Sequence, residues 1–242
     1  MQTFVGAQVY LPGEIVETTV TIEGDAIVEI GGPVRGAEID ARDKVLAPAL
    51  IDVHGDAFER QVMPRPGVFF PLETAVLETD RQLAANGIAT TYHSVTLSYE
   101  PGLRSVERGR AMMEAIRALQ PRLTVENRVQ LRWETFAFEA LDTLDCAMEE
   151  ELTPSLAFND HLSMAMRSAE TGIQDRPFEH SPDFIPMALD DAALFEKRYR
   201  KHTERSGLDY EDHKALVLRV WERRSEVVGM LQEVAATARA EG

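Results

Sequence analysis

The sequence is poor in cysteine and in basic residues, and it has no long apolar run. Its single cysteine, Cys146, excludes an internal disulfide framework and favours a reducing, cytoplasmic location. No stretch of about 18 apolar residues occurs, and the first residues lack the basic start and apolar core of a secretory signal, so no membrane partner is expected. With 25 Lys and Arg against 41 Asp and Glu, the net charge of −16 also argues against nucleic acid as a partner.

Several catalytic motifs are absent as well. The chain contains no glycine-rich phosphate loop, no Gly-x-Ser-x-Gly and no Cys–His nucleophile arrangement. Covalent catalysis therefore has no candidate nucleophile, and water activated by a metal ion is the chemistry that remains. The acidic net charge does not exclude an anionic small substrate, because local Arg side chains or a bound cation can dominate the field inside a cleft.

The pattern of apolar and polar residues divides the chain into two parts. Residues 1–44 alternate apolar and polar residues between glycine-containing turns, which predicts a small β-sandwich segment. From Val45 onward, strand and helix patterns alternate. Strands are expected over 45–53, 88–95, 128–134 and 154–158, and helices over 72–86, 104–119, 139–152 and in one or two pieces between 190 and 239. The predicted fold class is therefore α/β, a (β/α) barrel of which residues 45–242 supply only half, because four strands are visible and a closed barrel needs eight.

The carboxyl ends of the predicted strands carry polar side chains, and in parallel βα folds the active site lies at these ends. The first strand runs through LIDVHGD and ends on His54 and Asp56. These two residues have the same parity, so both side chains point to one face, and imidazole and carboxylate are good ligands for divalent Zn, Mn or Fe. The alternative is an Asp that caps a loop beside a packed His. We predict that His54 and Asp56 bind a metal.

The third strand places Gln130, Arg132 and Glu134 on one face. Three polar groups in a row are costly in a barrel interior unless they are paired or meet a metal. Glu134 is therefore a candidate metal ligand, and an Arg132–Glu134 ion pair is the alternative.

Five further residues are candidates for substrate binding. Arg132 could hold an anion, and Arg65 lies in a Pro-flanked loop where a guanidinium could clamp phosphate, with a surface salt bridge as the alternative. His93 is either a substrate contact or a histidine packed in the core with its hydrogen bonds satisfied. Asp160 and His161 begin a loop after the fourth strand, where an Asx-turn is the competing role. The remaining candidates, His180, His202 and His213, lie in polar or helical stretches, and a structural role is expected for each.

The sequence resembles the amidohydrolase superfamily, in which a β-rich start leads into an apolar strand that ends in HxH or HxD. LIDVHGD, VMPRPGV (62–68), GIATT (87–91) and LRWE (131–134) together resemble one branch, the alpha-D-ribose 1-methylphosphonate 5-triphosphate diphosphatases of phosphonate metabolism. NDH (159–161) and FEKRY (195–199) match later parts of its pattern more loosely. The resemblance extends over nearly the whole chain, and the pairing of HxD with MPRPGV is its most specific part.

The resemblance implies a metal-dependent hydrolase that releases pyrophosphate from a ribosyl triphosphate ester. His54 and Asp56 would bind the more buried of two divalent ions, and Glu134 would be shared between both. Members of that family are longer and carry two further His ligands and a general-base Asp on later strands, so the catalytic residue is expected outside this chain. The expected partners are an anionic phosphorylated small molecule and either a second copy or the rest of a longer chain. Two alternatives stay open: an enzyme acting on a C–N bond (deaminase or cyclic amidase), and a catalytically inactive half-barrel that binds or assembles.

Overall fold

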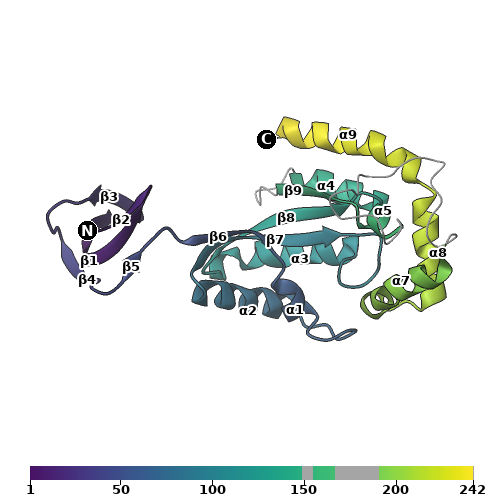
Figure 1. Cartoon of the computed structure of the whole chain (residues 1–242), viewed down its shortest axis with the longest axis horizontal. Helices are drawn as coiled ribbons and strands as arrows, with labels where there is room; N and C mark the ends of the chain where they lie inside the picture. The colour runs from purple at the N-terminus through teal and green to yellow at the C-terminus, as the bar shows by residue number, and fades with distance from the viewer. Residues whose placement is uncertain (149–154, 167–190, 242) are drawn as a thin grey trace. The chain divides into compact units, whose positions relative to one another are not determined.

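Residues 1–148, 155–166 and 191–241 are described by a computed structural model, shown in Figure 1. The chain divides into two units, Met1–Leu50 and Ile51–Gly242, each of which is described here by itself. Within the described residues, no helix combines the length and the apolar character needed to cross a membrane.

The first unit is a single five-stranded sheet. Its strands are β1 (Gln2–Leu11), β2 (Glu14–Glu23), β3 (Ala26–Ile30), β4 (Ala37–Asp40) and β5 (Val45–Leu46). The order is β3-β2-β1-β4, and β5 pairs with β1. Gly24, with φ of 62°, makes the tight turn between β2 and β3 that the sequence predicts. A small core of Ala7, Val9, Val20 and Ala41 covers part of one face. The predicted sandwich is not seen, because the five strands all join one sheet and no second layer faces it within residues 1–50.

The predicted strand over 45–53 is two strands in the structure. Val45–Leu46 pairs in parallel with β1 of the first sheet, whereas β6 (Leu50–Gly55) belongs to the second sheet. Pro48 lies between them and has no backbone N–H to donate to a continuous ladder. The apolar residues of this stretch are also less buried than their pattern suggests, since Ile51 and Val53 are each 63% exposed. β6 is an edge strand of its sheet, and none of its residues belongs to a hydrophobic core, which agrees with this exposure.

The second unit confirms the predicted α/β fold. Its four-stranded sheet has the order β6-β7-β8-β9, with parallel pairing of β7 (Ile88–Leu97) to β8 (Glu126–Glu134) and of β8 to β9 (Ser155–Asn159). The helices between the strands are α1 (Phe58–Val62), α2 (Leu72–Ala85), α3 (Val106–Leu119) and α4 (Leu141–Met148), with 3-10 turns at Gln120–Arg122 and Phe138–Ala140, and α5 (His161–Met166) follows β9. The strands and helices therefore lie close to the positions that the β-branched runs and the helix-ending Gly87 predict.

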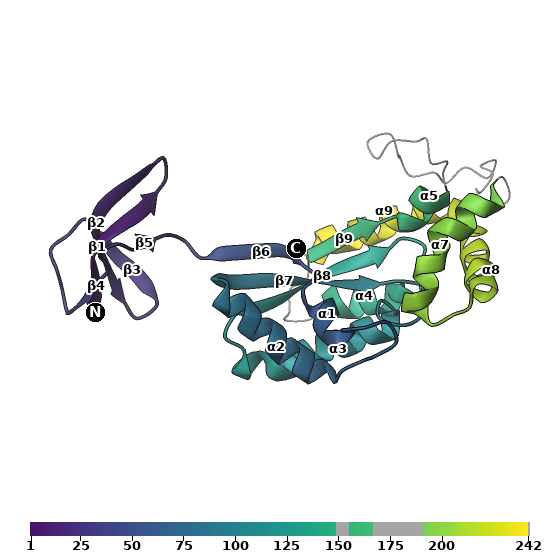
Figure 2. The same cartoon turned by 60° about the horizontal axis from the view of Figure 1, so that its bottom comes forward.

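The two faces of this sheet differ in character. Odd-numbered residues of β7 and β8, such as Val95, Leu131 and Trp133, pack against α1 to α4 in the main hydrophobic core. Figure 2 shows α2 and α3 running along this side of the sheet. Because side chains alternate along a strand, the even-numbered residues point to the other side. We call that side, formed by Ser94, Thr96, Gln130, Arg132 and Glu134, the polar face.

Three helices end the chain where one or two were predicted. They are α7 (Ala192–Ser206), α8 (Tyr210–Trp221) and α9 (Arg224–Glu241). Gly207, with φ of 74°, ends α7, and the Asp209 side chain caps α8 by accepting a hydrogen bond from the Asp212 N–H. Both views show α7 and α8 beyond the carboxyl ends of the strands (Figures 1 and 2). A second core holds them there, built from Phe136, Phe195, Tyr199, Val217, Trp221 and Val227 together with Leu162 and Met166.

Candidate functional site

The polar face begins at His54, whose orientation is fixed by Gln130. The Gln130 Nε2 donates to the backbone carbonyl of Val53 over 3.3 Å, so its Oε1 is the atom that lies 2.5 Å from His54 Nδ1. Ser94 Oγ donates to the same Oε1 over 3.2 Å. An amide oxygen only accepts, so the Nδ1 of His54 is the nitrogen that carries the proton in the neutral ring, and the lone pair of that ring is then on Nε2. This is the arrangement in which a histidine is ready to bind a metal ion.

Asp56 follows directly after β6, and its side chain is exposed. Its backbone carbonyl accepts a hydrogen bond from the Glu59 N–H at the start of α1. Gly55, between His54 and Asp56, lies at a crowded position. A Cβ there would lie 2.9 Å from Thr91 Oγ1 and 2.8 Å from Asp52 Oδ2. The glycine therefore lets β6 approach β7 closely at the site.

Glu134 ends β8 and is buried beside His161. One carboxylate oxygen forms a very short contact with His161 Nδ1, and the other accepts a hydrogen bond from the His161 N–H over 3.3 Å. The hydrogen bond to Glu134 raises the pKa of His161. Within the part of the chain that the structure describes, no ion pair joins Glu134 to Arg132, so the alternative raised by the sequence is not observed.

Three buried hydrogen-bond donors on the polar face have no partner among the described residues. They are Arg132 Nε, Thr96 Oγ1 and Asn159 Nδ2. Arg132 is 9% exposed and lies opposite Thr96 in the β7–β8 register, while Asn159 lies opposite Glu134 in the β8–β9 register. A buried donor without an acceptor costs about 1–3 kcal/mol, more when it is charged. The grouping of three such donors favours an anionic ligand at this place.

Arg104 also belongs to this end of the sheet, although the sequence does not single it out. Its guanidinium donates to both carboxylate oxygens of Glu59 on α1, over 2.8 and 2.9 Å. Burial opposes the charged form, but the hydrogen bonds to Glu59 outweigh it and raise the pKa of Arg104. The pair ties α1, and with it the segment after Asp56, to the loop that follows β7.

His93 does not lie on the polar face, which corrects its assignment as a substrate-binding residue. β7 continues to Leu97, so His93 is in the middle of the strand, and its odd parity turns it toward the helices. It is 1% exposed, contacts the Phe58 ring edge-on, and its Nε2 lies 2.6 Å from Asn127 Oδ1. Burial lowers the pKa of His93. It is the satisfied core histidine that the sequence left as the alternative.

The other residues considered in the sequence analysis, Asp160, Arg65 and His180, differ in where they lie. Asp160 caps α5, accepting a hydrogen bond from the Ser163 N–H over 2.7 Å, which is the local role that competes with substrate binding. Arg65 is exposed in the turn after α1, where the Val68 N–H donates to its carbonyl. Within the described part of the chain, no hydrogen bond or ion pair joins Arg65 to the polar face. His180 lies outside the described residues.

A second group of possible ligands lies on the loop after β7 and on the C-terminal helices. Among the described residues, one group of three possible metal ligands has all of its ligand atoms within 4.8 Å of one another: Glu100, His202 and His213. The predicted ligands His54, Asp56 and Glu134 do not meet this distance. Burial opposes ionisation of Glu100, but hydrogen bonds to the two imidazoles outweigh it and lower its pKa to about 2. The sequence offers no signal for this group, because Glu100 is 102 residues from His202 and 113 from His213.

Comparisons with known proteins give distant likenesses. No family model matches the chain. Over 126 residues, 51% of this chain and 33% of the relative, it is 28% identical to alpha-D-ribose 1-methylphosphonate 5-triphosphate diphosphatase of Escherichia coli (strain K12). The chain thus spans about a third of the length of the curated relative that it matches.

Similar solved structures include dihydropyrimidinase from Brevibacillus agri NCHU1002, with 18% identity, a TM-score of 0.40, and coverage of 62% of this chain and 31% of that one. D-hydantoinase from Bacillus sp. AR9 has 20% identity, a TM-score of 0.40 and the same two coverages. An amidohydrolase from Brucella melitensis has 13% identity and a TM-score of 0.35, with coverage of 66% of this chain and 46% of that one.

Proposed function

We propose that this chain is part of a metal-dependent hydrolase of the amidohydrolase type that releases pyrophosphate from alpha-D-ribose 1-methylphosphonate 5-triphosphate. The observation that carries the proposal is the set of three unpaired buried donors on the polar face, Arg132 Nε, Thr96 Oγ1 and Asn159 Nδ2. These donors suit a phosphate group, which offers several acceptor oxygens and negative charge. The 28% identity to the diphosphatase supports the choice of substrate.

The metal ligands in this proposal are His54, Asp56 and Glu134. The proton on His54 Nδ1 is held by Gln130, which leaves Nε2 free to coordinate, and Glu134 supplies a buried carboxylate on the same face. A divalent cation bound there supplies Lewis-acid activation of water and neutralises charge at phosphorus. No described residue is assigned the role of general base.

The chain's own residues bind and orient the substrate. Arg132, Thr96 and Asn159 donate to phosphate oxygens, and burial strengthens these bonds because water does not compete for them. His161, whose pKa is raised by Glu134, holds a proton on Nδ1 beside the carboxylate. Arg65 lies in an exposed turn, and we propose that it contacts the outer phosphates when substrate is bound.

Binding of inorganic tripolyphosphate tests the anion site, measured by calorimetry on the full chain. Arg132→Gln removes the guanidinium whose Nε is unpaired, and its matched control is Arg128→Gln on the same strand, where Arg128 already pairs with Glu126. Loss of a charge-assisted hydrogen bond costs about 1.5–3 kcal/mol, so Arg132→Gln should weaken binding by about 10- to 150-fold, and Arg128→Gln should leave it unchanged. Equal affinities for the two variants would contradict the assignment.

The reaction itself is tested with chain loaded with Zn²⁺ or Mn²⁺ and with the remaining part of the enzyme present. Pyrophosphate release supports the proposal, whereas ammonia release from an amino-substituted ring, or ring opening of a cyclic amide, would favour the C–N hydrolase. His54→Ala combined with Asp56→Ala should abolish pyrophosphate release.

A further inference from the structure

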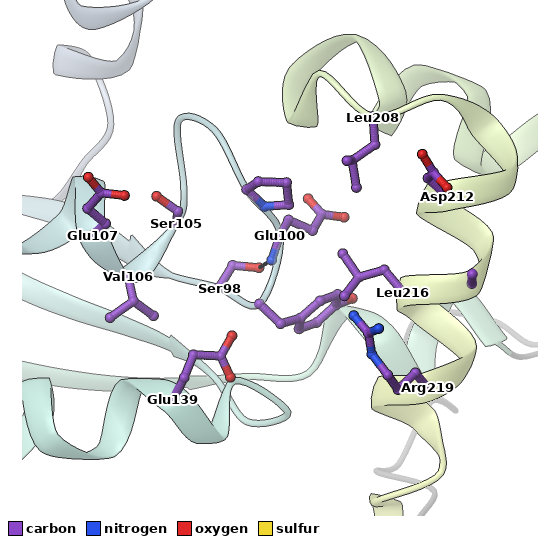
Figure 3. Close-up of a pocket in the computed structure, with 13 residues that line it drawn as sticks. Ser98, Glu100, Ser105, Val106, Glu107, Glu139, Leu208, Asp212, Leu216 and Arg219 are labelled. Atoms are coloured by element: carbon purple, nitrogen blue, oxygen red, sulfur yellow. Dashed lines mark hydrogen bonds between the residues drawn. The ribbon is translucent and has the colours of Figure 1, made fainter.

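Glu100, His202 and His213 come from three separate elements and meet at the carboxyl end of β7. Glu100 lies on the loop after β7, His202 on α7 and His213 on α8. The Glu100 Oε1 is 3.2 Å from His202 Nδ1 and 3.1 Å from His213 Nε2. Figure 3 shows Glu100 on its loop, facing the helix that carries Asp212 and Leu216.

We propose that Glu100, His202 and His213 bind one zinc-type divalent cation, which ties α7 and α8 to the loop after β7. This site is separate from the one on the polar face and shares no ligand with it. Two imidazoles and one carboxylate are a donor set that suits Zn²⁺.

The distances between the ligand atoms fit such a site. Zinc–nitrogen and zinc–oxygen bonds of about 2.0–2.2 Å in tetrahedral geometry place neighbouring ligand atoms about 3.3–3.6 Å apart. The two contacts of Glu100 are 3.2 and 3.1 Å, so an ion would need each of these two contacts to lengthen by only a few tenths of an ångström. The third ligand pair also lies within 4.8 Å.

The hydrogen-bonding pattern without an ion is contradictory at His202. Its Nδ1 faces the Glu100 carboxylate, which can only accept, and also lies 3.1 Å from the donor Nη2 of Arg205. One nitrogen cannot donate to Glu100 and accept from Arg205 at the same time. A cation resolves the conflict, because it takes the lone pairs of Nδ1 and of the carboxylate together, while Arg205 turns outward from the end of α7.

The surroundings suit a cation that is held firmly and can enter from solvent. His213 is fully buried, and the Tyr199 ring lies 5.1 Å from the His202 ring and 5.4 Å from the His213 ring, which holds both imidazoles in place. Glu100 also lines a cavity of about 580 Å³ (Figure 3). That lining has four carboxylates, Glu100, Glu107, Glu139 and Asp212, against the single guanidinium of Arg219, a balance that attracts cations.

Zinc retention tests this site apart from the polar face. The full chain carrying His54→Ala and Asp56→Ala, which lacks two of the three metal ligands proposed on the polar face, is dialysed against Zn²⁺ and desalted, and its metal content is measured. We expect one zinc per chain. Adding Glu100→Gln or His202→Gln should abolish retention. Adding Glu107→Gln, which changes a carboxylate of the same cavity that does not contact the imidazoles, should leave one zinc.

Cobalt absorption gives a second readout, which does not require the Glu100→Gln and His202→Gln variants to fold. Co²⁺ bound to the His54→Ala/Asp56→Ala chain should give the intense visible bands of a four-coordinate ion with nitrogen ligands. Zinc should also raise the thermal midpoint of this chain, since it binds only the folded form. The proposal is overturned if the folded chain retains no zinc and shows no such bands, or if Glu100→Gln and His202→Gln retain as much zinc as Glu107→Gln. Neither result would affect the tripolyphosphate test of the polar face.

Discussion

Replacing Asp80 by Ala should strongly destabilise the second unit. Asp80 lies on α2 and is 2% exposed. Its Oδ1 accepts hydrogen bonds from the Val125 N–H over 2.9 Å, from Asn127 Nδ2 over 3.0 Å and from the Thr124 N–H over 3.1 Å. The carboxylate thus joins α2 to the start of β8 and, through Asn127, to His93 on β7.

The cost follows from the donors that Asp80→Ala leaves unpaired. The Val125 N–H and the Asn127 amide are buried, and each loses an acceptor at about 1–3 kcal/mol. The Thr124 N–H is partly exposed, so water can replace its partner. The expected loss in the free energy of unfolding is therefore about 2–6 kcal/mol, a large part of the roughly 5–15 kcal/mol that stabilises a typical domain.

The measurement is chemical denaturation followed by tryptophan fluorescence, which reports on the core because Trp133 is fully buried. Asp80→Asn is the first control: its side-chain oxygen can still accept the three bonds, so it should lose less than Asp80→Ala. Glu78→Ala is the second control, since Glu78 lies on the same helix with its side chain 46% exposed, and it should stay within about 0.5 kcal/mol of wild type. If Asp80→Ala unfolds at the same denaturant concentration as Glu78→Ala, the hydrogen-bond network contributes nothing.

Two more changes test the placement of residues near the site. Because burial lowers the pKa of His93, the unfolded chain binds a proton that the folded chain does not, so stability should fall as pH drops below about 6.5. The variant His93→Gln can still donate a hydrogen bond to Asn127 but does not titrate. The free energies of unfolding of wild type and His93→Gln, measured by denaturation from pH 7.5 to 5, should therefore differ by an amount that changes as the pH falls. A difference that stays constant with pH would refute a buried neutral His93. Gly55→Ala places a Cβ 2.9 Å from Thr91 Oγ1 and should reduce zinc retention at His54. The far-ultraviolet circular dichroism should stay unchanged. Full zinc retention would show that β6 need not approach β7 closely.

Much of the second unit could be predicted from local patterns. The β-branched run that starts at Ile88 is a strand, and the helix before it stops where Gly87 adopts a positive φ of 75°. Parity along the third strand placed Gln130, Arg132 and Glu134 on one face, and the contact of Gln130 with His54 is consistent with that face. Local rules suffice here because strand alternation and helix termination depend on residues only a few positions apart.

Other features depend on partners that are distant in sequence. Parity shows that His93 shares a face with Val95, but only the packing of Phe58 shows that this is the helix-covered face. The stretch that begins at Val45 looks like one strand, and it is divided because Val45 and Leu46 pair with β1, some 37 residues earlier.

The sequence by itself determined the alternation of strands and helices, the acidic net charge and the strand-end positions of His54, Asp56 and Glu134. Only the tertiary structure decided which donors on the polar face are left unpaired, that His161 meets Glu134, and that Glu100 lies between two histidines of the C-terminal helices. The reason is physical: a periodic pattern specifies which side of its own element a residue occupies, whereas its neighbours across space are set by how the elements pack.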